Sequence, residues 1–248
     1  MSAPGSRLIL FPGLGADARL FFRQQAHFGE RLVTPALLRP REGEDLPAYA
    51  ARWAPLLEGQ GVLAPPFVLG GMSFGGQVAL EMTRAAKVKP AAVVLIASSR
   101  TSDSIPPRFR QQQAWGRRLP HALVRFGLRR LAGLFRLREG LDPEARRMLA
   151  RMAAEADIGM LRWGAQAASA WRFTEADARA LGAPIYQIHG AADWVIPPHP
   201  GHPDRLLAGA RHLITFTHPG EVNRYLEEAM AAVSAAPPAP AGGGRTSR

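Results

Sequence analysis

The sequence of 248 residues contains no cysteine, which excludes disulfide bonds and thiolate metal ligands. It also contains no apolar run near the roughly 20 residues that a membrane-spanning helix requires. The first residues, Met1 to Phe11, lack the charged segment, the long apolar segment and the cleavage site of a secretory signal. These absences predict a cytoplasmic protein without a membrane span and without a cysteine metal site.

Lysine is nearly absent, since Lys87 and Lys89 are the only two, and arginine supplies the other basic side chains behind a net charge of +11. This composition fits a high-GC coding bias, which would leave much of the arginine excess without functional meaning. The excess is uneven, because the segment from Arg100 to Arg151 holds 13 arginines and only four acidic residues. We interpret this segment as a solvated basic surface, with the steering of an acidic partner as the alternative, and predict no nucleic-acid partner.

Short apolar runs alternate with longer amphipathic ones, which is typical of a parallel sheet with crossover helices. Five runs predict strands: Arg7 to Phe11, Phe67 to Gly71, Ala91 to Ala97, Pro184 to His189 and Arg205 to Leu207. Helices are predicted at Gln77 to Ala86 and at Glu221 to Val233. The Pro- and Gly-rich residues 235–248 are predicted to form a disordered tail.

The segment from Thr101 to Asp177 contains no convincing strand and breaks this alternation. It predicts four helices: Pro107 to Leu119, His121 to Leu137, Pro143 to Ala156 and Ile158 to Trp171. The second carries one apolar face, made of Val124, Leu128, Leu131 and Phe135. A helical block between sheet strands indicates a cap over the carboxyl edge, where ligands bind in open α/β folds. The predicted division is therefore a core of residues 1–100 and 178–234 with a helical cap of residues 101–177.

A nucleophile motif, Gly71-Met72-Ser73-Phe74-Gly75, follows a predicted strand and precedes a predicted helix, as the G-x-S-x-G elbow requires. The glycines Gly71 and Gly75 are needed because larger side chains would collide with the backbone of so tight a turn. The turn lifts the Ser73 hydroxyl clear of the sheet and points a helix N-terminus at developing negative charge. The motif predicts Ser73 as a nucleophile.

A serine hydroxyl needs a base within hydrogen-bond reach, and the base needs an orienting carboxylate. Among the seven histidines, His189 is interpreted as packed at a strand end, and the loop pair His199 and His202 lacks the carboxylates of a metal site. His212 and His218 both follow the last predicted strand. His218 precedes Pro219, a favoured first helical residue, so we predict His212 as the base and leave His218 as a helix-start residue.

The acid is predicted at Asp193, which follows the strand Pro184 to His189 across a short turn, with Asp103 as the alternative. The order Ser73, Asp193, His212 agrees with the order expected for a G-x-S-x-G fold. The glycine turn Pro12-Gly13-Leu14-Gly15 after the first strand supplies a further backbone donor. Leu14 and Phe74 are therefore predicted to donate the N–H groups of an oxyanion hole.

From Leu8 to Ala231 the chain resembles the α/β-hydrolase superfamily. Three segments carry the resemblance: an oxyanion loop at Phe11 to Phe21, an acid loop at Ile188 to Pro197, and a catalytic-histidine segment at Gly209 to His212 followed by Thr217 to Asn223. The resemblance implies an α/β-hydrolase fold, a mostly parallel sheet flanked by helices with a helical cap inserted. It also implies His212 as the base.

The chain departs from that pattern at Pro12, where many members have histidine, and at Arg211, where a small residue usually precedes the base. Residues 198–203 are too few for the usual crossover helix, which predicts a short loop between the last two strands. Ser73 excludes the branches that use an aspartate nucleophile, the dehalogenases and epoxide hydrolases.

The sequence thus predicts a carboxylic-ester hydrolase that forms an acyl-enzyme on Ser73 and needs neither cofactor nor metal. The substrate is predicted to be a small-molecule ester. Distant similarity to the pimeloyl-carrier-protein methyl esterase family implies, as an alternative, an ester or thioester on an acidic acyl carrier. A non-catalytic ligand receptor on the same fold is a further alternative, because fold does not settle function.

Overall fold

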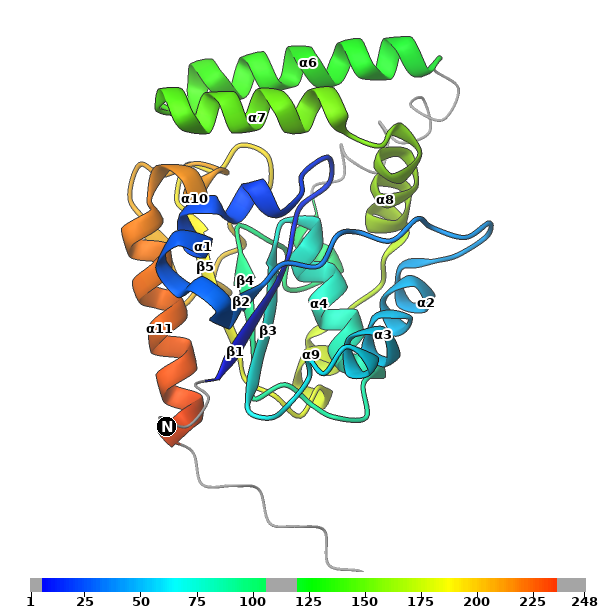
Figure 1. Ribbon diagram of the computed structural model, residues 1–248, viewed down its shortest axis with the longest axis vertical. Helices are drawn as coiled ribbons and strands as arrows, with labels where there is room; N and C mark the ends of the chain where they lie inside the picture. The colour runs from blue at the N-terminus through cyan, green and yellow to red at the C-terminus, as the bar shows by residue number, and fades with distance from the viewer. Residues whose placement is uncertain (1–5, 106–119, 236–248) are drawn as a thin grey trace, which may run out of the picture.

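The computed structural model describes residues 6–105 and 120–235, and within them a single six-stranded parallel sheet forms the centre of the molecule (Figure 1). The strand order is β2-β1-β3-β4-β5-β6, and every neighbouring pair is parallel. The strands are β1 (Arg7–Phe11), β2 (Leu32–Val33), β3 (Phe67–Met72), β4 (Ala92–Ile96), β5 (Ile185–Gly190) and β6 (Arg205–Leu207). All five predicted strands are confirmed within two residues at each end.

Both faces of the sheet are buried. Successive side chains of each central strand point to opposite sides, so each strand contributes to two separate cores. In β1, Leu8 and Leu10 contribute to one apolar core, and Ile9 and Phe11 contribute to the other. Burial on both faces explains why β3 and β4 are continuous apolar runs rather than alternating ones.

Helices cover the two faces as separate layers (Figure 1). One face carries α1 (Phe22–Phe28), α10 (Ile214–Thr217) and α11 (Pro219–Ala235). The other carries α2 (Leu46–Ala51), α3 (Trp53–Gly59), α4 (Phe74–Ala85) and α9 (Glu175–Ala180). Short 3₁₀ turns lie at Ala18–Phe21, Gly29–Arg31 and Ser102–Ser104. The α4 and α11 helices confirm the two core helices that the sequence predicts.

A cap of helices lies over the carboxyl end of the sheet (Figure 1). It comprises α6 (His121–Arg138), α7 (Pro143–Glu155) and α8 (Ile158–Ala170), and α6 and α7 pack side by side across the top. Aspartate side chains cap two of these helices: Asp142 accepts from Ala145 N at 2.9 Å and Asp157 from Met160 N at 3.1 Å. These three helices confirm the prediction, while the helix predicted at Pro107 to Leu119 lies outside the described residues.

Two further expectations concern the end of the chain. β5 and β6 are joined by residues 191–204 without a helix, as the sequence predicts. The α11 helix continues to Ala235, and the remainder of the predicted tail, residues 236–248, lies outside the described residues. Across residues 6–105 and 120–235, no helix combines the length and the apolar character that crossing a bilayer demands.

Candidate active site

The carboxyl edge of the sheet gathers the loops that hold the site residues. Ser73 follows β3, Asp193 follows β5, and His212 lies in the loop that follows β6. The glycine turn that carries Leu14 follows β1. Since parallel strands all end at this edge, residues from distant parts of the sequence meet under the cap.

Ser73 occupies a sharp strand-to-helix turn with a positive φ of 55° and a ψ of −123°. A non-glycine residue in this region is strained, and such strain persists only where the surrounding structure holds it. Here the Ser73 backbone N–H donates to Ile96 O at 3.0 Å, and Ser73 O accepts from Gly76 N at 3.0 Å and from Ser98 Oγ at 2.6 Å. The turn is therefore fixed from both sides.

The motif glycines make this turn possible by close backbone packing. A Cβ atom at Gly75 would overlap the carbonyl group of Phe11, and one at Gly71 would overlap the backbone of Gly75. Gly76 packs equally tightly against the Ser98 side chain. Only glycine fits these positions, which is the physical reason for the spacing of the motif.

Asp193 and His212 form a buried hydrogen-bonded pair. Asp193 Oδ2 lies 2.7 Å from His212 Nδ1, and the two residues are 4% and 5% exposed. Asp193 Oδ1 also accepts from the backbone N–H groups of Val195 at 2.8 Å and Ile196 at 2.9 Å. Because an ionised carboxylate only accepts, Nδ1 carries the proton of the neutral imidazole, and in that tautomer Nε2 of His212 is the acceptor.

The pKa of Asp193 reflects two opposing effects. Burial raises the pKa of this carboxyl, but the interactions with His212 and His189 outweigh burial and hold the pKa well below its ordinary value. Asp193 is consequently ionised throughout the neutral range. It can orient an imidazole at Nδ1 and stabilise positive charge that develops on it.

His189 is a second histidine on the same carboxylate, and the sequence did not reveal this role. Its Nε2 lies 3.1 Å from Asp193 Oδ2 and 2.8 Å from Ile196 O, and its side chain is 1% exposed. The residue is packed at a strand end, as predicted, but it also contacts the candidate acid. His189 lies four residues before Asp193, across the Gly190 turn, and this spacing is the feature of the sequence that could have indicated the contact.

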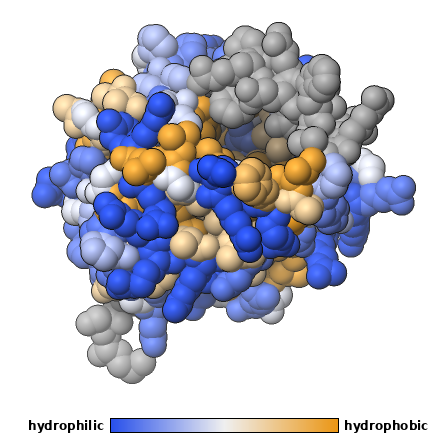
Figure 2. Space-filling model, turned by 90° about the horizontal axis from the view of Figure 1, so that it is seen from above, coloured by the Kyte–Doolittle hydropathy of each residue, from blue (hydrophilic) through white to orange (hydrophobic). Residues whose placement is uncertain are grey.

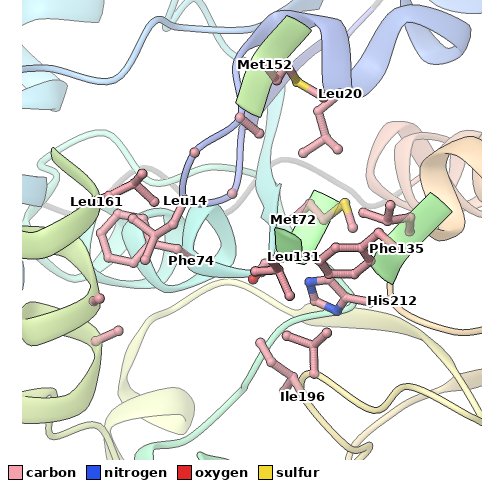
Figure 3. Close-up of a pocket in the computed structure, with 18 of the residues that line it drawn as sticks. Leu14, Leu20, Met72, Phe74, Leu131, Phe135, Met152, Leu161, Ile196 and His212 are labelled. Carbon is pink, nitrogen blue, oxygen red and sulfur yellow. The ribbon is translucent and has the colours of Figure 1, made fainter. Parts of the chain in front are cut away.

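An apolar cavity of about 370 Å³ lies between the sheet edge and the cap (Figure 3). Ser73 and His212 both line it, and so do Leu14 and Phe74. From the cap, Leu128, Leu131, Phe135, Met152 and Leu161 contribute apolar side chains. Among the described residues, the lining contains no arginine, lysine, aspartate or glutamate; its polar side chains are Ser73, Gln77, Ser99, Ser169 and His212.

The two predicted oxyanion donors, Leu14 and Phe74, belong to segments that lie next to Ser73. Phe74 is the first residue of α4, so its N–H has no acceptor within the helix. The turn that carries Leu14 runs directly against the nucleophile, since a Cβ at Gly13 would lie 3.3 Å from Ser73 Cβ. Within the described residues no hydrogen bond joins Ser73 Oγ to His212, a contact that often tightens only when substrate binds.

The alternative residues lie elsewhere. Asp103 is an exposed residue of the 3₁₀ turn after β4, and His218 bonds to Thr217 Oγ1 at 2.9 Å just before α11 begins. Neither belongs to the described lining of the cavity.

In the part of the chain that the structure describes, the loop pair His199 and His202 does not form a metal site of three or more ligands. His199 stacks on His202 with ring centroids 4.0 Å apart. The described residues contain no group of three or more histidine, aspartate or glutamate side chains that could hold a metal ion.

Comparison with known proteins gives three results. A family model described as the alpha/beta hydrolase family matches residues 8–236. No curated protein matches the chain. Solved structures share the fold, including a thermophilic esterase from Thermogutta terrifontis, with 21% identity and a TM-score of 0.73 over 93% of this chain and 91% of that one.

Two further solved structures show how varied the proteins with this fold are. MenH from S. aureus has 13% identity and a TM-score of 0.73, over 94% of this chain and 96% of that one. An epoxide hydrolase from Bacillus megaterium has 15% identity and a TM-score of 0.70, over 92% and 94%. At these identities the likeness establishes the fold and leaves the substrate open.

Proposed function

The chain belongs to the alpha/beta hydrolase family, and on that basis we propose that it is a carboxylic-ester hydrolase with Ser73 as nucleophile, His212 as base and Asp193 as orienting acid. The single observation that carries this proposal is the convergence of a strained Ser73 and an Asp193-paired His212 on one apolar cavity. A ligand receptor has no need of a positive-φ serine beside an imidazole whose tautomer is fixed.

The proposed reaction proceeds through an acyl-enzyme. His212 Nε2 accepts the hydroxyl proton of Ser73 while Oγ attacks the ester carbonyl, and the N–H groups of Leu14 and Phe74 bind the resulting oxyanion. The tetrahedral intermediate collapses, and the leaving alkoxide takes the proton from His212. Water then attacks the acyl group in the same way, releases the acid and restores Ser73. The chemistry consumes only water and requires no cofactor.

The cavity supports an uncharged, largely apolar ester as the small-molecule substrate. Apolar side chains from the core and the cap surround Ser73, and no charged side chain lies among the described lining residues. Burying apolar substrate surface against them favours binding by about 25 cal/mol per Å². An unpaired substrate charge would lose its hydration there without a partner.

A second candidate, an ester or thioester on an acidic acyl carrier, is favoured by the outer surface of α6. Arg129, Arg130 and Arg136 are exposed on this helix. Figure 2 shows the face seen from the cap side, where hydrophilic and apolar side chains are interspersed. An acidic carrier could approach this surface while its acyl group entered the cavity.

Assays of p-nitrophenyl esters of graded chain length test the main proposal. Ser73→Ala is expected to lower kcat by several orders of magnitude, on the order of 10⁶-fold as for serine knockouts in other triads. Ser104→Ala, which removes a hydroxyl outside the cavity, is the matched control and is expected to retain wild-type rates. Turnover that is absent from the wild type, or unchanged in Ser73→Ala, would favour the receptor alternative.

A further inference from the structure

Glu139 is a buried carboxylate at the junction between the cap and the core. It is the residue directly after α6 and is 6% exposed, although a lone carboxylate normally remains in solvent. Burial of its charge is unfavourable unless hydrogen-bond donors replace the lost water. The structure supplies three such donors, and all of them come from the loops that carry Asp193 and His212.

The contacts of Glu139 connect these two loops. Oε2 accepts from the backbone N–H of Leu213 at 3.0 Å, and Oε1 accepts a longer bond from the backbone N–H of His212 at 3.4 Å. Oε1 also accepts from Trp194 Nε1 at 3.0 Å. Trp194 directly follows Asp193. One carboxylate of the cap therefore fixes the backbone of the candidate base and the residue next to the candidate acid.

The last turn of α6 makes two further contacts with the same loop. The Phe135 ring lies beside the imidazole of His212, with centroids 6.2 Å apart (Figure 3), and packs on Trp194 at 5.0 Å. The guanidinium group of Arg211 donates to the carbonyl oxygen of Arg138. The loop after β6 is thus held from the cap by a ring contact and by hydrogen bonds on three consecutive residues.

We propose that Glu139 is a positioning residue for His212, an inference that rests on the proposed function. Asp193 fixes the imidazole at Nδ1, and Glu139 fixes the backbone from which the imidazole extends. With both ends held, Nε2 is directed at Ser73 without a search through other conformers. Displacement of a catalytic group by about 1 Å can cost about 100-fold in rate.

Glu139→Gln tests this role with little change in volume. The amide keeps one acceptor oxygen but turns an NH₂ group toward at least one of the three donors, so at least one bond is lost. Glu144→Gln is the matched control, because Glu144 is an exposed acidic residue of the same cap and loses the same charge. The readouts are the rate of fluorophosphonate labelling at Ser73, kcat and KM for an aryl ester, and thermal stability.

We expect Glu139→Gln to label 10- to 100-fold more slowly and to lose kcat by a similar factor, while KM changes by less than threefold. The low-field proton NMR signal of the His212–Asp193 hydrogen bond should broaden or vanish in this variant and persist in Glu144→Gln. A purely structural role would lower the melting temperature but leave labelling below that temperature unchanged. That result would overturn the inference.

Trp194→Phe provides a second variant should Glu139→Gln fail to fold. It removes the indole donor to Glu139 and keeps an aromatic ring against Phe135. Labelling slowed severalfold supports the role of Glu139, and labelling at the wild-type rate contradicts it. The two failures can be distinguished. If the wild type does not label at Ser73, the proposed function itself is overturned. If wild type and variant label at equal rates, only the role of Glu139 is overturned.

Discussion

The sheet edge and the cap contribute to the site in different ways. The sheet edge carries the proposed catalytic residues: Ser73, Asp193 and His212 each lie within a few residues of a strand end, and short turns fix them. The cap supplies the apolar walls, and its helices place those walls through tertiary packing over long sequence distances. The proposed catalytic residues are therefore encoded locally, whereas the cavity walls depend on how helices pack.

Helix α6 shows this difference most clearly, because one of its sides lines the cavity and the other faces solvent. Leu128, Leu131 and Phe135 face the cavity. On the same helix Leu123 is 53% exposed and Phe126 is 56% exposed, so an apolar side chain alone does not indicate which face lines the cavity. Substitutions at the sheet edge should consequently change kcat, and substitutions on the inner face of the cap should change KM.

Asp193→Asn tests the sheet edge and has the largest expected effect. An amide at this position presents the wrong partner to Nδ1 and favours the wrong tautomer of His212, so kcat should fall by about 10⁴-fold. The measurement is steady-state hydrolysis of an aryl ester. Asp103→Asn is the control, because Asp103 is an exposed residue outside the cavity lining, and it should retain the wild-type rate. Loss of activity in Asp103→Asn alone would identify Asp103, rather than Asp193, as the orienting acid.

Leu128→Ala tests the cap. Removing this side chain from the cavity wall takes away contacts made equally in the ground and transition states, so KM for a short-chain ester should rise about tenfold while kcat is retained. Longer acyl chains should regain part of the loss by filling the space. Leu123→Ala removes a leucine from the outer side of the same helix and should change neither constant. A fall in kcat alone would show that the cap acts on the chemical step at this position.

Much of the fold can be predicted from the sequence, because a strand that is buried on both faces is a continuous apolar run. The apolar run that forms β4 (Ala92–Ile96) was predicted within one residue at each end. In contrast β2 (Leu32–Val33) has two residues and no run to detect, and it is a strand only because β1 lies beside it. The α2 helix was missed although Asp45 caps it and Pro47 lies in its first turn, a start signal that was present in the sequence.

The site, like the fold, has residues that the sequence predicts and one that it does not. Ser73, Asp193 and His212 could be proposed because each follows a strand and each carries chemistry that needs the others. Glu139 could not, because its partners Trp194 and Leu213 lie 55 and 74 residues further along the chain. Nothing in the local sequence distinguishes this carboxylate from an exposed one. Only the packing of α6 on the loops that carry Asp193 and His212 reveals its contacts.

The smallest effect is expected from the outer arginines of the cap. In the double variant Arg129→Gln and Arg136→Gln, rates on a small aryl ester should change less than twofold, because neither residue lines the cavity. For an ester on an acidic acyl carrier, wild-type kcat/KM should fall as salt rises, since screening weakens attraction between exposed charges. The variant should flatten that dependence. Equal salt dependence for the carrier-bound and the small ester would exclude steering by the cap and leave its arginines as a solvated surface.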